Sequence, residues 1–146
     1  MQKVIKLIII FTLCVLSFKV RAQNDSSGFS KVYFICNFGN TPGIDNYNIF
    51  IDSTFKCKLN ERRYSIHEVQ SGIHNFSIRF AGKRKPKRNI EKTIINIASG
   101  KIYYILLMKR FDTFLTYIYC QEITENTANT IISQLELDKS CGSVKQ

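Results

Sequence analysis

The greatest concentration of chemically active side chains lies between residues 82 and 89. Five of the six consecutive residues 83–88 are cations, and the sixth is Pro86. Mutual repulsion keeps such a run out of a packed interior, so we expect a solvated tip between two strands. The charge also predicts attraction to a polyanion, with an affinity that falls steeply as salt rises. The predicted anion-binding residues are Lys83, Arg84, Lys85, Lys87 and Arg88.

The partners of this run are predicted from its charge alone. Envelope phosphates, acidic polysaccharide or nucleic acid met outside the cell would each supply the opposite sign. Specific recognition of nucleic acid is not expected, because residues 82–89 contain no aromatic side chain on which a base could stack. An unidentified envelope protein and a peripheral contact with a membrane surface are the other partners that the sequence allows.

Four cysteines follow residue 22. An even number in an exported protein favours disulfides, because the compartment outside the cytoplasm is oxidising. Four cysteines allow three pairings, and the sequence does not choose among them. The chain has no C-x-x-C pair, and both histidines lie on predicted strands, so neither a metal site nor a cofactor is predicted. The candidate disulfide residues are Cys36, Cys57, Cys120 and Cys141.

No catalytic residue is predicted. His74 falls on the apolar face of a strand beside Phe76, which is typical of a hydrogen-bonded structural histidine, and we expect His67 to be half exposed. A Cys–His nucleophile pair would need a free thiolate, which the oxidising compartment disfavours. The acidic residues are scattered, and no glycine-rich phosphate loop is present. The sequence therefore predicts a protein that is not an enzyme.

The first 22 residues are typical of a secretory signal peptide. Lys3 and Lys6 precede the apolar stretch 7–18, and small residues at Val20 and Ala22 place cleavage before Gln23. An uncleaved N-terminal anchor is the alternative. Four of the 21 Lys and Arg residues precede Gln23 and none of the 11 acids does, which leaves 17 − 11 = +6. The predicted location is periplasmic, cell-surface or secreted.

Alternating polarity predicts strands over most of the remaining chain. His74, Phe76, Ile78 and Phe80 fall on one face of a strand that Ser71-Gly72 introduces, and Ser99-Gly100 introduces a later strand in the same way. Residues 102–108 are apolar on both faces, which predicts a strand covered on both sides. The predicted strands span residues 31–36, 47–52, 55–59, 63–69, 73–80, 90–97, 102–108 and 111–120.

One helix is predicted near residues 125–137. Ala128, Ile131, Ile132 and Leu135 form an amphipathic stripe, and Thr124 or Asn126 is the predicted N-cap. The expected organisation is a flexible leader over 23–30, one domain over 31–141, and a tail over 142–146. Strands at this spacing predict an all-β protein, a single antiparallel β-sandwich of about seven to eight strands with one C-terminal helix.

Four short stretches resemble a family of short exported bacterial domains of unknown function, many of them lipoproteins, related to PEGA-motif domains. The resemblance implies a small immunoglobulin-like or transthyretin-like β-sandwich without known catalytic residues. Ser53 and Ser71 stand where the family pattern has glycine and proline, and the lipid-acceptor cysteine is missing. The matching stretches, within residues 31–120, are Val32-Tyr33-Phe34, Tyr47 to Asp52, Ser71 to His74, and Ser99 to Tyr104.

These observations predict a non-enzymatic accessory or interaction domain of the bacterial cell envelope. The alternative is a secreted binder of anionic ligands, whose basic tip at residues 82–89 is its main purpose. Neutralising the five cations separates the two, because only the second would lose its function.

Overall fold

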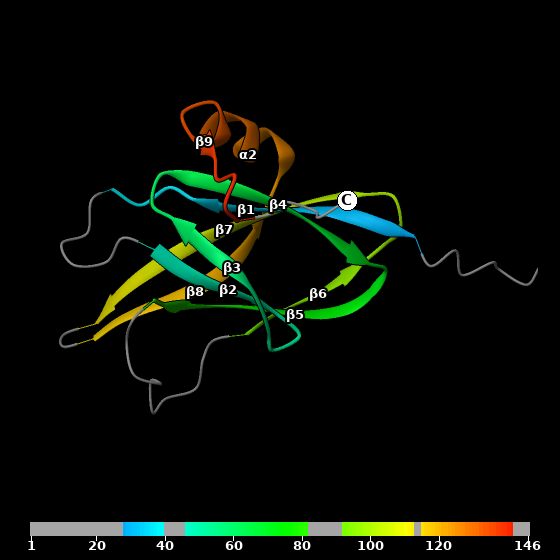
Figure 1. Ribbon diagram of the computed structural model, residues 1–146, viewed down its shortest axis with the longest axis horizontal. Coiled ribbons are helices and arrows are strands. Elements are labelled where there is room, and N and C mark those ends of the chain that lie inside the picture. Colours follow the sequence, from blue (N-terminus) through cyan, green and yellow to red (C-terminus); the bar gives the residue numbers. More distant parts are fainter. Residues whose placement is uncertain (1–27, 40–45, 82–91, 113–114, 142–146) are drawn as a thin grey trace, which may run out of the picture.

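The computed structural model describes residues 28–39, 46–81, 92–112 and 115–141. The predicted signal peptide, most of the leader, the basic loop 82–89 and the tail 142–146 lie outside these residues. The described chain forms two β-sheets and one helix (Figure 1). The elements are β1 (Phe29–Cys36), β2 (Asn46–Ile51), β3 (Thr54–Asn60), β4 (Arg63–Gln70), β5 (Gly72–Phe80), β6 (Thr93–Ile97), β7 (Ile102–Asp112), β8 (Leu115–Ile123), α2 (Glu125–Ile132) and β9 (Glu136–Leu137).

The strands divide into a five-stranded sheet, with the order β8-β7-β1-β4-β9, and a four-stranded sheet, with the order β3-β2-β5-β6. The all-β prediction is confirmed as a sandwich-like arrangement. The prediction of purely antiparallel sheets is wrong, because β1 pairs in parallel with β7 and β4 pairs in parallel with β9. Between β1 and β7 the chain passes through the whole four-stranded sheet, so it returns beside β1 in the same direction.

The main core lies between the inner faces of the two sheets. The predicted alternation is confirmed: Tyr47, Ile49 and Ile51 of β2 point inward and are buried, as are Phe76 and Ile78 of β5. Removing such side chains from water is the dominant favourable contribution to folding. The other fully buried side chains of this core include Val32, Phe34, Cys36, Leu59, Ile97, Ile105 and Leu107.

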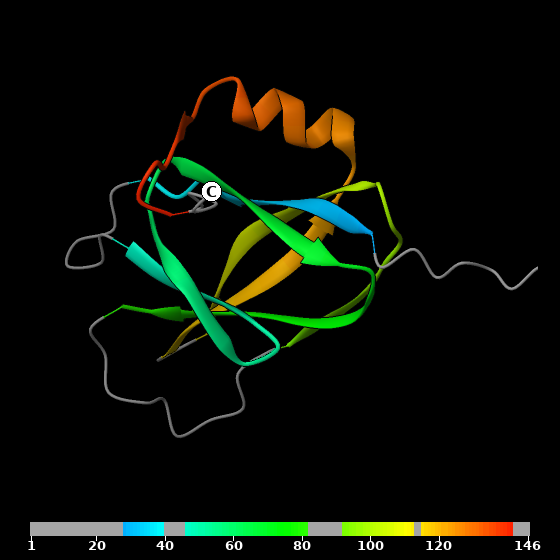
Figure 2. The same ribbon diagram turned by 45° about the vertical axis from the view of Figure 1, so that its right-hand side comes forward.

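A second apolar cluster covers the outer face of the five-stranded sheet. Helix α2 lies across this face (Figure 2) and buries Ala128 against Ile35 and Tyr104. The prediction that β7 is covered on both sides is confirmed, because Ile105 faces the main core and Leu106 packs against the helix cluster. The helix therefore shields the part of this outer face that carries Ile35 and Tyr104.

The C-terminal helix is shorter than predicted. It begins after Thr124, whose side chain accepts a hydrogen bond from the backbone N–H of Thr127, as the predicted cap requires. The helix ends at Ile132 instead of residue 137, because residues 136–137 pair with β4 as β9. The backbone N–H of Asp138 continues this attachment by donating to the carbonyl of Tyr64.

The boundary between β7 and β8 corrects one further prediction, and the predicted turn after β2 is present. The predicted strand 111–120 is two strands, because β7 runs to Asp112 and pairs as a hairpin with β8. The two-residue turn between β2 and β3 places both Asp52 and Ser53 at positive φ, 51° and 65°. This geometry matches the twist of a tight hairpin, and glycine adopts it without a Cβ penalty.

Candidate functional site

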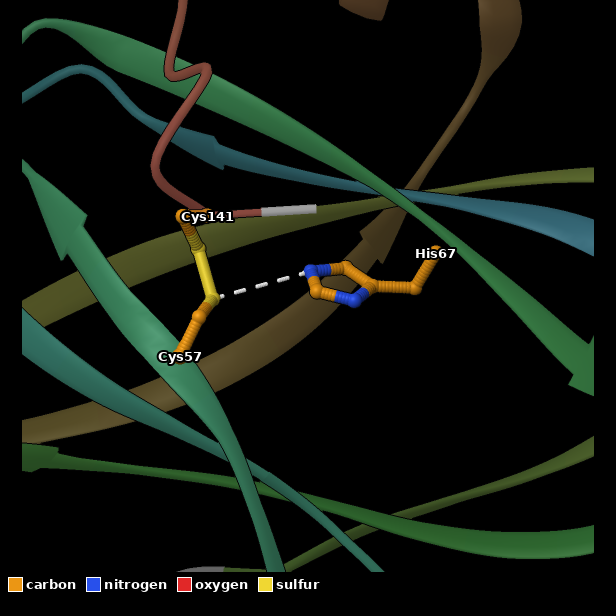
Figure 3. Close-up of side chains that lie close together, drawn as sticks. All are labelled: Cys57, His67 and Cys141. Atoms are coloured by element: carbon orange, nitrogen blue, oxygen red, sulfur yellow. Dashed lines mark hydrogen bonds between the residues drawn. A yellow bond between two sulfur atoms is a disulfide. The ribbon is translucent and has the colours of Figure 1, made fainter. Parts of the chain in front are cut away.

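A disulfide and a histidine lie together where β3 approaches β4. Cys57 of β3 is bonded to Cys141, which follows β9, and their Cα atoms are 5.1 Å apart. The Nε2 atom of His67, on β4, lies 3.7 Å from the Sγ atom of Cys57 (Figure 3). The bond closes a sequence separation of 84 residues and ties the C-terminal segment to the four-stranded sheet. The structure therefore joins Cys57 to Cys141, which is one of the two bonds in one of the three possible pairings.

His67 lies deeper than predicted. It shares the inward face of β4 with Ser65 and Val69, both buried. Its Nε2 lies 3.1 Å from Ser65 Oγ, and its ring packs edge-on against Phe34. Burial, with a smaller effect from the positive charge of Lys56, lowers the pKa of His67 to about 4. The imidazole is therefore neutral at pH 7 and keeps a nitrogen lone pair.

The other two candidate disulfide residues are free thiols. Cys36 and Cys120 are buried in the main core. Burial raises the pKa of both thiols to about 12, because the interior disfavours a thiolate. A nucleophilic cysteine needs a thiolate and access to substrate, and burial opposes both.

His74 is held by hydrogen bonds, as predicted. Its Nδ1 lies 2.6 Å from a carboxylate oxygen of Asp52, and its Nε2 lies 2.8 Å from the carbonyl oxygen of Gln70. Asp52 also accepts from the backbone N–H of Asn75. Partial desolvation raises the pKa of the Asp52 carboxyl, but the hydrogen bonds from Asn75 and His74 outweigh it, so its pKa is lowered overall. The pair joins the β2–β3 turn to β5.

The outer face of the four-stranded sheet is the second candidate surface. No described element covers it, in contrast with the outer face of the five-stranded sheet. Ile73 and Ile94, diagonal neighbours on β5 and β6, are 73% and 68% exposed, and Phe55 is 50% exposed. Lys58 and Arg79 both pair with Asn48 and extend the same face. We call these residues, together with Phe50, the basic-apolar face.

Charge is unevenly divided between the two sheets. Strands β2, β3, β5 and β6 contain Lys56, Lys58 and Arg79 and no aspartate or glutamate. Arg79 stacks over the ring of Phe50 with its guanidinium carbon 4.5 Å from the ring centre, so cation and aromatic side chain are held together. The strands of the five-stranded sheet, in contrast, carry both signs, including Glu68, Glu122 and Glu136.

A hollow beside the C-terminal segment has a volume of about 580 Å³. Arg63 and Glu136 line it and form an ion pair of 3.2 Å with each other. Asp138, which also lines it, accepts from the backbone and side-chain nitrogens of Asn60 and from the hydroxyl of Ser140. These polar groups satisfy one another and anchor the segment that precedes Cys141.

Comparisons with known proteins give no match: no family model, no curated protein and no solved structure corresponds to this chain. Within the residues that the structure describes, no helix combines the length and apolar character that crossing a bilayer requires. The function must therefore be argued from the structure itself, above all from the disulfide site with His67 and from the basic-apolar face.

The sequence predicted that disulfides would form, but it did not predict the two candidate sites themselves. The five basic residues of the loop 82–89 lie outside the described residues, so their predicted role stays a prediction. The basic-apolar face was missed, although the alternation of β5 already placed Ile73 and Arg79 opposite the core-facing residues. The proximity of His67 to Cys57 was also missed, because it depends on how the edges of two different sheets meet.

Proposed function

We propose that the protein is a non-enzymatic, exported accessory domain of the bacterial cell envelope that docks on an anionic membrane surface. The basic-apolar face and the loop 82–89 form its contact surface. The observation that carries the proposal is the exposure of Ile73 and Ile94 on the uncovered face of an acid-free sheet. In the same proposal, the sandwich is of immunoglobulin-like or transthyretin-like type.

The apolar side chains favour a membrane over a polymeric anion. Exposed aliphatic side chains gain free energy when they enter the boundary between lipid headgroups and acyl chains. Nucleic acid would instead stack its bases on aromatic rings, but the most exposed side chains of this face are the aliphatic Ile73 and Ile94, and Arg79 covers a face of the Phe50 ring. Acidic polysaccharide offers charge but no apolar layer to receive Ile73 and Ile94.

The cations supply the electrostatic part of the attraction. Each Lys or Arg close to an anionic leaflet contributes about 1 kcal/mol, which salt screens. Residues 82–89 stand in the sequence between β5 and β6, so five further cations belong to the connection between two strands of the same sheet. Cationic side chains can contact the anionic headgroups, and aliphatic side chains on the same surface can contact the acyl chains beneath them.

The alternative function is a secreted binder of soluble anionic ligands, in which the loop 82–89 acts alone. The charge of the loop favours this alternative, whereas the exposed Ile73 and Ile94 have no role in it. The two functions therefore differ in their dependence on the apolar side chains.

Vesicle sedimentation tests the proposal. The chain beginning at Gln23, which retains every described element, should bind phosphatidylglycerol vesicles at low salt, and should release them at 0.5 M salt. Ile73→Ser with Ile94→Ser should weaken vesicle binding at least tenfold while heparin retention is unchanged. Replacing the five loop cations by Gln should reduce both vesicle binding and heparin retention. A matched control, Ile102→Ser, alters an exposed isoleucine of the other sheet.

Two outcomes would overturn the membrane proposal. Absence of vesicle binding at low salt would remove it, whatever the behaviour on heparin. Vesicle binding that depends on the loop cations but not on Ile73 and Ile94 would favour the soluble anionic ligand instead.

A further inference from the structure

The disulfide region brings together three side chains of types that can ligate a metal ion when the disulfide is open. The sulfur atoms of Cys57 and Cys141 and a ring nitrogen of His67 all lie within 4.8 Å of one another. They come from three separate segments, β3, β4 and the chain after β9, and converge beside the core (Figure 3). We propose that the reduced protein binds one thiophilic d10 cation, Zn²⁺ or Cu⁺, through these three residues.

The spacing suits such a cation. Zinc bound to sulfur at about 2.3 Å and to nitrogen at about 2.0 Å in tetrahedral geometry holds the two ligand atoms roughly 3.5 Å apart. The Nε2 of His67 and the Sγ of Cys57 are separated by 3.7 Å. Cα atoms 5.1 Å apart keep the two cysteines close enough for both sulfurs to reach one ion after the bond opens. Small side-chain movements therefore suffice.

The oxidation state decides whether the site exists. In the disulfide neither sulfur is a thiolate, so the pair cannot act as an anionic ligand. A dithiol reductant transfers two electrons and two protons to the disulfide, which becomes two thiols while the reductant becomes a cyclic disulfide. The cation then displaces one proton from each thiol and forms two metal–sulfur bonds. His67 adds a neutral nitrogen ligand without loss of a proton.

The ligand set restricts the identity of the cation. Two thiolates and one imidazole are soft or borderline ligands, which suit Zn²⁺ and Cu⁺ and are poor ligands for Mg²⁺ or Ca²⁺. Three protein ligands suit trigonal Cu⁺, or tetrahedral Zn²⁺ with a water in the fourth position. The hydroxyl of Ser65, 3.1 Å from His67 Nε2, contacts the same nitrogen, so this hydrogen bond must give way when a cation binds there.

The fold keeps the ligands together after reduction. Asp138 accepts hydrogen bonds from both nitrogens of Asn60, three residues beyond Cys57, and Asp138 itself precedes Cys141 by three residues. The backbone N–H of Asp138 also donates to Tyr64 on β4. These bonds do not involve sulfur, so they hold Cys141 near β3 when the disulfide opens. The cation then takes over the link between the C-terminal segment and the four-stranded sheet.

Metal titration of the reduced protein tests the inference. The chain beginning at Gln23, with Cys36→Ala and Cys120→Ala as background, is reduced with a dithiol and freed of reductant without oxygen. Competition with a chromophoric chelator should show one Zn²⁺ per chain, and Co²⁺ should give sulfur-to-cobalt charge-transfer absorption. Parallel titration with Cu⁺ identifies the preferred cation. The oxidised protein should bind neither.

Variants separate the site from adventitious binding. His67→Ala should weaken Zn²⁺ affinity at least tenfold, and Cys57→Ala should abolish the charge-transfer band. Glu68→Ala, an exposed neighbour on the same strand, should leave affinity unchanged. Circular dichroism of each reduced variant confirms folding. Failure of the folded, reduced background protein to retain either cation would overturn the inference, as would unchanged affinity in His67→Ala.

Discussion

The Nζ atom of Lys109 lies 3.6 Å from Oε1 of Glu61, although the two side chains are only 9% and 11% exposed. Glu61 also accepts a hydrogen bond from the hydroxyl of Tyr47, and the Lys109 ammonium lies 4.0 Å from the centre of the Phe38 ring. The pair therefore joins the turn after β3 to strand β7 through a shielded network. Desolvation of the two charged groups costs free energy, and the attraction between them offsets that cost.

Breaking this pair should strongly destabilise the fold. Glu61→Gln removes the negative charge that faces the shielded Lys109 ammonium, and we expect a loss of about 3–5 kcal/mol in the free energy of unfolding. Adding Lys109→Met removes the second charge and should recover most of that loss, because the new amide oxygen can still accept from Tyr47. Urea unfolding of both variants measures the difference. Equal stability of the single and double variants would contradict this account.

The turn between β2 and β3 offers a stabilising substitution. Ser53 adopts φ 65°, a conformation that costs a residue with a Cβ atom roughly 1–2 kcal/mol. Ser53→Gly should therefore raise the free energy of unfolding by about 1 kcal/mol, reduced somewhat by the greater freedom of glycine in the unfolded chain. Ser53→Ala, which keeps the Cβ atom, is the matched control and should bring no such gain. Thermal unfolding of the three proteins checks the order.

Asp52 should make part of the stability depend on pH. Its folded pKa is lowered, so its contribution is complete above the unfolded value of about 3.9 and is lost as pH falls through the folded pKa. Asp52→Asn should therefore be less stable than the wild type at pH 7, by about 0.5 kcal/mol after allowance for solvent screening, and the gap should narrow as the pH falls below the unfolded value. Urea unfolding at pH 7, 4 and 2 measures it. A gap that stays constant would refute the assignment.

Removal of the disulfide should weaken the fold through the unfolded state. Cys57 and Cys141 are 84 residues apart, so their bond excludes many extended conformations of the unfolded chain. Cys57→Ala with Cys141→Ala should lower the free energy of unfolding by about 2–4 kcal/mol. Chemical reduction of the wild type, with metal chelated, should produce a similar loss. Urea unfolding measures both losses, and a double variant as stable as the wild type would count against this role.

The local pattern of the sequence predicted the strands that face the core. Alternation works for β2 and β5 because one face is buried and the other is not, so polarity follows side-chain direction. It failed near residue 112, where no glycine or proline separates β7 from β8. It also overextended the helix, because the pairing of Glu136 and Leu137 with β4 depends on a distant strand.

The candidate sites were harder to predict for the same reason. A count of cysteines indicates disulfides, but the choice of Cys57 and Cys141 depends on which sheet edges meet. The position of His67 beside these two cysteines depends on the same packing of one sheet against the other. The parallel pairing of β1 with β7 has no local sequence signal, since either direction would bury the same apolar side chains.

That parallel pairing limits the order in which the chain can assemble. A polypeptide emerges N-terminus first, whether from a ribosome or from a translocation channel, so β1 is released long before its partner β7. Until residues 102–106 follow, one hydrogen-bonding edge of β1 stays open and can recruit other chains. Nascent molecules of this protein should therefore need a holding chaperone through most of their synthesis, and truncations before residue 102 should aggregate.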